Sequence, residues 1–289
     1  MKTIIFSLAI VACTAVSFAD EPDMRKYSDE ADKTAQTLRE RIQEEIKTLS
    51  KHVWAGEYYA GDGLGMNVYL SLAPKAGYVY EWHGCMGLYD RDYGAVEEKE
   101  GRLHLSFTFE HHQSEFFGIA EELVPVSWGE RRYLVSARGF IDFCNEINAG
   151  SEPRKGVHGM TLLCRGDEQK KATGLPSVPK AFEPYLLSKP IETEIIAIGD
   201  TTKSSKESAV REIRIRVTVK YGSKAGLLSG MKLYVVKPNS VFDSIVLDKV
   251  DEGQSEGVIT RYSLAGVMGL LSLLDNDPKI GWKLSTRRP

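Results

Sequence analysis

The chain has 289 residues, a formal net charge of −3 and 42% hydrophobic residues. Its length predicts about two domains, and its composition is that of a folded globular protein. Acidic and basic residues are interspersed, so no cationic face is expected to follow a phosphate backbone, and the composition excludes nucleic acid as an expected partner.

Residues 1–19 have the pattern of a signal peptide, with a basic Met1-Lys2, an apolar run to Phe18 and small residues before a cleavage site after Ala19. A second interpretation is a lipobox at 10–13, which would make Cys13 a lipid anchor. Both predict export to the periplasm or cell surface. No later apolar run reaches the roughly 18–20 residues of a membrane span, so the exported body is not expected to be transmembrane.

Three cysteines, Cys85, Cys144 and Cys164, remain after cleavage at Ala19. An odd number in an oxidising compartment allows one disulfide with one free thiol. Three buried thiols are the alternative, because free cysteine packs like a small apolar residue.

Residues 20–53 predict an amphipathic helix. Apolar residues recur at spacings of three and four, and Ser28 precedes two acids as an N-cap would. We expect this helix to pack on the domain that follows, because the stripe is too short for a stable coiled coil. The stripe comprises Ala31, Ala35, Leu38, Ile42, Ile46, Leu49 and Val53.

Residues 54–166 predict an antiparallel β-rich domain, a barrel or a sandwich, because apolar residues alternate with polar ones. Two alternating sets are Met66, Val68, Leu70 and Leu72, and Leu103, Leu105, Phe107 and Phe109. A turn is expected at Gly129-Glu130 and a short helix over 140–148. Residues 167–190 contain four prolines and predict an extended connector held by Phe182, Tyr185 and Leu186.

Residues 191–289 predict a second, small β-barrel domain. Its clearest strand places Ile213, Ile215, Val217 and Val219 on one face. Residues 264–274 predict a short buried helix, and residues 280–284 a closing strand. The expected fold is therefore mainly β (α+β overall), with an N-terminal helix, an antiparallel barrel or sandwich, and a small C-terminal barrel.

The segment 217–236 contains Gly222, Gly226 and Gly230 between two apolar strands. It resembles small β-barrels of bacterial cell-envelope proteins, including cell-shape-determining and flagellar-accessory ones. The resemblance implies a barrel corner and a role in assembly, and it brings no catalytic residue. The first domain resembles secreted bacterial proteins without an assigned activity.

Glu81, His83 and Cys85 would share one face of an unbroken strand, and these residue types can bind a transition metal such as zinc. A bulge at Gly84 would break this alignment. The alternative for Cys85 is a packed or disulfide-bonded thiol.

Two other polar clusters are expected to be structural. The run 110–115, with adjacent His111 and His112, predicts a solvated loop. The run 90–94, Asp-Arg-Asp-Tyr-Gly, begins like a calcium loop but lacks its later ligands, so a hairpin turn is expected.

Aromatic residues are dense between residues 54 and 94 and could form a platform for a sugar or a peptide. The residues proposed for it are Tyr59, Tyr80, Trp82 and Tyr89. Core packing is the alternative explanation. The sequence contains no G-x-S-x-G or H-E-x-x-H pattern, and no catalytic residue and no cofactor is predicted.

The sequence thus predicts an exported, non-catalytic binding or assembly module of the cell envelope, with an envelope protein or glycan as partner. A lipocalin-like carrier with a ligand inside the first domain is one alternative. A glycan-directed hydrolase using carboxylates such as Glu57 and Asp62, or a metal-dependent one, is the other.

Overall fold

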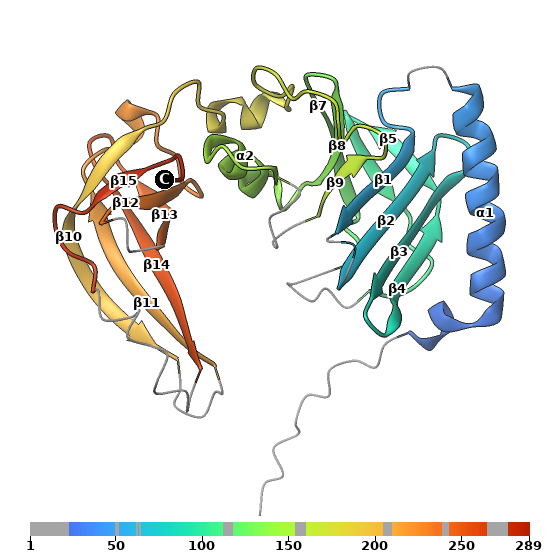
Figure 1. Cartoon of the computed structure of the whole chain (residues 1–289), viewed down its shortest axis with the longest axis horizontal. Helices are drawn as coiled ribbons and strands as arrows, with labels where there is room; N and C mark the ends of the chain where they lie inside the picture. The colour runs from blue at the N-terminus through green and yellow to red at the C-terminus, as the bar shows by residue number, and fades with distance from the viewer. Residues whose placement is uncertain are drawn as a thin grey trace, which may run out of the picture.

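A computed structural model describes residues 23–49, 52–61, 63, 65–111, 118–153, 160–204, 210–238, 243–264 and 277–289. Within these ranges the chain forms two antiparallel β structures, with a long helix on the outer face of the first and helix α2 between them (Figure 1). The predicted fold class is confirmed. The expected signal peptide, with Cys13 and Ala19, lies outside the described residues, as does all of the helix expected at 264–274 except Leu264.

The N-terminal segment consists of a 3-10 helix, η1 (Met24–Tyr27), and the helix α1 (Asp29–Thr48). Ser28 caps α1 by accepting a hydrogen bond from the Ala31 amide, as predicted. Ala35 and Ile42 are buried against Ala73 and Val79 of the first sheet. The helix ends at Thr48, five residues before the predicted end, and Val53 of the expected stripe is exposed.

The first sheet has nine strands in the order β4-β3-β2-β1-β9-β8-β7-β6-β5. They are β1 (Gly56–Gly61), β2 (Met66–Ala73), β3 (Gly77–Gly84), β4 (Gly87–Gly94), β5 (Val96–Lys99), β6 (Arg102–Leu105), β7 (Glu122–Trp128), β8 (Arg131–Ser136) and β9 (Thr161–Cys164). Ala95 alone separates the edge strands β4 and β5, so one bent stretch of chain supplies both edges and nearly closes the barrel. The predicted turn at Gly129 joins β7 to β8.

The inside of this first barrel is filled with large side chains. Its core comprises Trp54, Tyr58, Leu70, Leu72, Tyr78, Tyr80, Leu103, Leu105, Ile119, Leu123, Leu134, Leu162 and Cys164, with smaller residues between them. Alternation along each strand directs the other side chains outward, where α1 covers β2 and β3 and α2 covers β8 (Figure 1).

Helix α2 (Phe140–Asn148) has the predicted bounds and contacts the connector and the second barrel. Phe182 of the connector's 3-10 helix, η3 (Lys180–Tyr185), stacks on Phe140 with ring centroids 4.2 Å apart. Tyr185 and Leu186 pack against the same cluster, as expected.

The second barrel is closed, in the order β10-β11-β14-β13-β12-β15. Its strands are β10 (Glu192–Lys203), β11 (Val210–Val219), β12 (Lys232–Lys237), β13 (Ser244–Val250), β14 (Ser255–Leu264) and β15 (Lys283–Ser285). Ile215, Val217 and Val219 lie in its core, as their alternation predicted. The closing strand β15 begins three residues later than expected, after a turn at Gly281 with φ 87°.

The glycine-containing segment between β11 and β12 forms a corner of this barrel. At Gly222 a β-carbon would lie 2.0 Å from the Asp251 carbonyl oxygen, a contact that only glycine avoids. Gly226 and Gly230 have φ values of 90° and 85°, in the left-handed region. The three glycines are thus required by the backbone path.

Candidate functional site

The residues predicted as metal ligands do not converge. Glu81 and His83 lie on the outer face of β3, where His83 Nε2 is 3.3 Å from Glu81 Oε2. The Glu81 carboxylate also pairs with Arg39 at 2.8 Å and Arg91 at 3.0 Å, beneath α1. Cys85 follows β3 as an exposed thiol, 3.9 Å from the Gly65 carbonyl oxygen. Among the described residues no three His, Cys, Asp or Glu side chains are placed to hold a metal ion.

Burial alone raises the pKa of Glu81, but Arg39, His83 and Arg91 lower it to a net value below the ordinary range. The carboxylate therefore stays ionised and ties α1 to the sheet. The strand pairing with β4 also shifts register between Trp82 and His83, beside the bulge that Gly84 suggested.

The aromatic residues proposed as a platform are divided between the two faces of the first barrel. Tyr80 is buried in the interior. Tyr59 faces outward and packs against Tyr69, with ring centroids 5.2 Å apart. Trp82 meets Tyr89 edge to face at 5.4 Å. These four side chains therefore do not share one surface.

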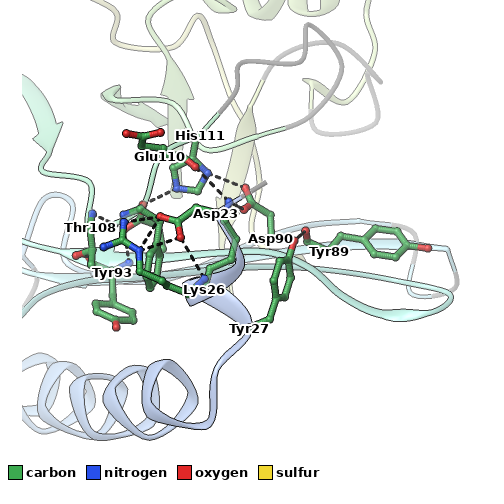
Figure 2. Close-up of polar contacts among 12 residues, drawn as sticks. Asp23, Lys26, Tyr27, Tyr89, Asp90, Tyr93, Thr108, Glu110 and His111 are labelled. Carbon is green, nitrogen blue, oxygen red and sulfur yellow. Dashed lines mark hydrogen bonds and ion pairs between the residues drawn. The ribbon is translucent and has the colours of Figure 1, made fainter. Parts of the chain in front are cut away.

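A buried charge network lies at the end of the first barrel near the start of α1 (Figure 2). Asp90 and Asp92 lie two residues apart on β4, and both side chains point into the barrel. Their partners on β3 are Trp82 and Tyr80. The predicted hairpin turn at 90–94 is therefore wrong: these residues form the second half of β4, and the turn precedes this strand at Cys85 and Met86. The two inward carboxylates require internal partners.

Those partners come from η1 and from the segment after β6. Lys26 Nζ lies 2.8 Å from Asp90, and its side chain is only 6% exposed. His111 lies between the carboxylates, with Nδ1 3.0 Å from Asp90 and Nε2 2.5 Å from Asp92. The solvated loop expected around His111 is thus wrong at this residue, whereas His112 lies outside the described residues.

The Asp92 carboxylate is fully buried and is surrounded by hydrogen-bond donors. It accepts hydrogen bonds from the Tyr78 hydroxyl and from the backbone amides of Tyr93, Thr108 and Phe109. Burial lowers the pKa of His111, but its hydrogen bonds to Asp90 and Asp92 raise it, to a net value of about 9. The imidazolium and Lys26 together balance the two carboxylates, so this network closes one end of the barrel and holds η1 against it.

An open pocket of about 820 Å³ lies near the opposite end of α1, beside β1, β8 and β9. It is lined by Gln43, Ile46, Lys47, Leu49, His52, Val53, Ala55, Gly56, Glu57, Ser127, Arg132, Cys164, Arg165 and Lys170. We call it the α1 pocket. Its wall combines four basic side chains and one acidic side chain with several apolar residues.

Arg132 lines the α1 pocket and is held by several partners. Its guanidinium donates to the His52 and Ala55 carbonyl oxygens at 3.3 and 3.5 Å and to Cys164 Sγ at 2.9 Å. Asp167, whose side chain is 1% exposed, lies 3.5 Å from Arg132 Nε and 2.5 Å from Lys170 Nζ. This buried carboxylate fixes both cations from behind.

The thiol and the imidazole at this site are neutral hydrogen-bonding groups. Burial raises the pKa of the Cys164 thiol to about 11, although Arg132 opposes the rise. His52 Nδ1 accepts from the Trp54 and Ala55 amides at 3.4 and 3.1 Å, which places the ring proton on Nε2. A protonated thiol is a poor nucleophile, so Cys164 serves here as a hydrogen-bonding group.

All three cysteines of the described chain are free, with Cys144 and Cys164 buried and Cys85 exposed. Neither predicted arrangement, one disulfide or three buried thiols, is correct. No helix of the described residues is long and apolar enough to cross a membrane.

Neither the α1 pocket nor the charge network was predicted from the sequence. The alternation of Asp90 and Asp92 around Arg91 was the available signal for the network, since side chains two residues apart lie on the same face of a strand. The pocket joins residues from 43 to 170, and no local pattern connects them. Searches against protein families, curated proteins and solved structures found no match for this chain.

Proposed function

We propose that this protein is an exported, non-catalytic binding module of the cell envelope and that its binding site is the α1 pocket. The observation that carries the proposal is this open pocket of about 820 Å³, whose wall combines fixed charges with exposed apolar surface. Concave sites of this size with a few oriented polar groups are typical of ligand-binding proteins.

The remaining ionisable clusters support a binding role because they serve the fold. Asp90, Asp92, Lys26 and His111 satisfy one another inside the barrel. Glu81 is committed to α1 through Arg39. The α1 pocket, in contrast, keeps charged groups in contact with solvent, including Arg165, whose side chain is 58% exposed.

The barrel interior argues for a site outside it rather than for a lipocalin-like carrier. Up-and-down barrels of carriers enclose a ligand cavity. Here Tyr58, Tyr78 and Tyr80 are fully buried within the barrel core. A carried ligand would have to displace these packed side chains.

Photocrosslinking in cells that export the protein tests the proposal. Benzoylphenylalanine is introduced at Val53, which lines the pocket, and at Ile280 as a control far along the chain; both residues are 67% exposed. A discrete adduct from position 53 and none from position 280 is expected. No adduct at position 53, or the same adduct at both positions, would refute a binding role of this pocket in cells.

A further inference from the structure

The charges of the α1 pocket are opposite in sign to the charge of the chain as a whole. The protein has a formal net charge of −3. The pocket wall nevertheless carries Lys47, Arg132, Arg165 and Lys170 against the single carboxylate of Glu57. A local excess of cations in a concave surface concentrates field and attracts anions.

The four cations of the pocket have three acidic partners, Asp167, Glu57 and Glu44, so one positive charge remains in excess. Glu44 lies 2.6 Å from Lys47 Nζ and is not among the lining residues. Asp167 is not among the pocket's lining residues and stays buried behind Arg132 and Lys170. Glu57 is held by Gln43, which donates to Oε1 at 2.8 Å, and by Arg165 at 3.6 Å. Because the Cys164 thiol stays protonated, it does not neutralise the guanidinium of Arg132 beside it.

The same pocket has an apolar side. Ile46, in the last turn of α1, and Leu49, directly after it, contribute aliphatic surface. Val53 and Ala55 continue this surface toward β1. Val53 is 67% exposed, although contact with water is unfavourable for an aliphatic side chain. A ligand that covers this surface would gain from apolar contact as well as from charge.

From this juxtaposition we infer that the α1 pocket binds an anionic amphiphile: a small molecule with one acidic group, facing Arg165, Lys170 and Lys47, and an aromatic or aliphatic part against Val53. The inference rests on the proposed function because it uses the same pocket, and it adds the chemical class of the ligand. The acid is recognised by charge-assisted hydrogen bonds, which are about twice as strong as neutral ones.

Two fluorescent probes of the same shape separate charge recognition from apolar binding. 8-Anilinonaphthalene-1-sulfonate carries an acidic group, and N-phenyl-1-naphthylamine is its uncharged counterpart. Titrated into the full mature protein, the sulfonate is expected to bind at one equivalent per chain and at least about tenfold more tightly than the amine. Its affinity should fall as salt is raised, because exposed charges are screened.

The variants are chosen so that the fold survives. The double variant K47Q/R165Q removes two exposed pocket cations, whose side chains are 68% and 58% exposed. The control K33Q/K171Q makes the same change in net charge at exposed residues outside the pocket. K47Q/R165Q should weaken sulfonate binding about tenfold and leave amine binding unchanged, whereas the control should bind both probes as the wild type does. Thermal unfolding of both variants checks that each is folded.

Equal affinity of the two probes for the wild type, or equal loss in the pocket and control variants, would overturn the inference. The outcome is separable from that of the crosslinking experiment. An adduct at position 53 without preference for the sulfonate would keep the binding site and reject the anionic ligand. Preference for the sulfonate without any adduct would keep the anion site and reject the binding role in cells.

Discussion

The side-chain amide of Asn145 on α2 pairs with the backbone of the second barrel as a neighbouring strand would: its Nδ2 donates to the Gly230 carbonyl oxygen at 2.9 Å. Its Oδ1 accepts from the Lys232 amide at 3.0 Å. One turn later Asn148 makes the same double contact with the Tyr185 carbonyl oxygen and the Leu187 amide, at 2.8 and 3.0 Å. Two asparagines thus fix the connector and the second barrel to one helix.

Asn145→Ala should lower the free energy of unfolding by about 2–3 kcal/mol, because Asn145 is 3% exposed and two backbone groups lose their partner. Urea denaturation gives the stability, and hydrogen exchange at Lys232 shows whether the contact is lost locally. The control Gln36→Ala removes an exposed side-chain pair with Glu40 on α1. Unchanged protection of the Lys232 amide in Asn145→Ala would contradict the prediction.

His111 should make stability depend on pH above neutrality. Its pKa rises from 6.5 to about 9 in the folded protein. A group whose pKa is raised on folding contributes fully below its unfolded pKa, so the contribution is present below pH 6.5 and disappears as pH rises through 9. The size is on the order of 3 kcal/mol.

The measurement for this prediction compares wild type with His111→Asn by urea denaturation at pH 6, 7.5 and 9.5. The difference in unfolding free energy between the two proteins should be largest at pH 6 and smallest at pH 9.5. A difference that stays constant over this range would show that His111 is not held charged by Asp90 and Asp92.

Lys26 and Asp90 should be strongly coupled, because both are mostly shielded from water and lie 2.8 Å apart. Lys26→Met leaves a buried carboxylate without this partner and should cost about 3 kcal/mol. In the double variant K26M/D90N part of this loss should be recovered. Simple additivity of the two single variants in a double-mutant cycle would contradict the coupling.

The neighbouring pair Arg25 and Asp23 serves as the control for Lys26. Arg25 Nη2 lies 2.6 Å from Asp23 Oδ2, but the arginine side chain is 73% exposed. Exposed pairs contribute little, so Arg25→Met should leave the denaturation midpoint unchanged.

Among the cysteines that the structure describes, Cys85 should be the one that reacts rapidly with thiol reagents in the folded protein. It is exposed, whereas burial raises the pKa of Cys144 to about 12 and that of Cys164 to about 11. Protein beginning at Asp20 should release about one equivalent of thionitrobenzoate at pH 8 with Ellman's reagent, and about three in denaturant. Cys85→Ser should abolish the fast phase. A second fast equivalent would show that a buried thiol is accessible.

Gly222 should tolerate no side chain. Gly222→Ala places a β-carbon 2.0 Å from the Asp251 carbonyl oxygen, so the corner between β11 and β12 must move. We expect a loss of at least about 2 kcal/mol in stability, measured by thermal or urea unfolding. Gly253→Ala is the matched control, because nothing lies within 4 Å of its added β-carbon. Similar unfolding of the two variants would be inconsistent with this contact.

The sequence was sufficient to predict the elements whose pattern is local. The alternation around Ile215 and the spacing around Ile42 each follow from one buried face, and both residues are buried. The N-cap at Ser28 and the bounds of α2 were also predicted, because they too depend on residues close together in the sequence. The corner at Gly222, Gly226 and Gly230 was implied by the resemblance to small envelope β-barrels. The structure adds that each glycine has a conformation or a clearance that other residues lack.

The candidate site could not be predicted because its parts are joined only by barrel closure. Asp90 was assigned to a hairpin turn and His111 to a solvated loop, whereas both are held inside the barrel by their partners. Their burial depends on Lys26, from a segment that precedes the domain. Arg132, Cys164 and Gln43 likewise meet only when β8, β9 and α1 are assembled.

The pairing of β1 with β9 has a consequence for the order in which this domain folds. Every other adjacent pair in the first sheet joins strands that follow one another along the chain, but Tyr58 pairs with Cys164, about a hundred residues later. Because closing this long loop has the largest entropic cost in the sheet, the pairing of β1 with β9 should form last. Until β9 has paired with it, β1 is an open sheet edge able to pair with other chains, so this domain needs its last strand to become safe from aggregation.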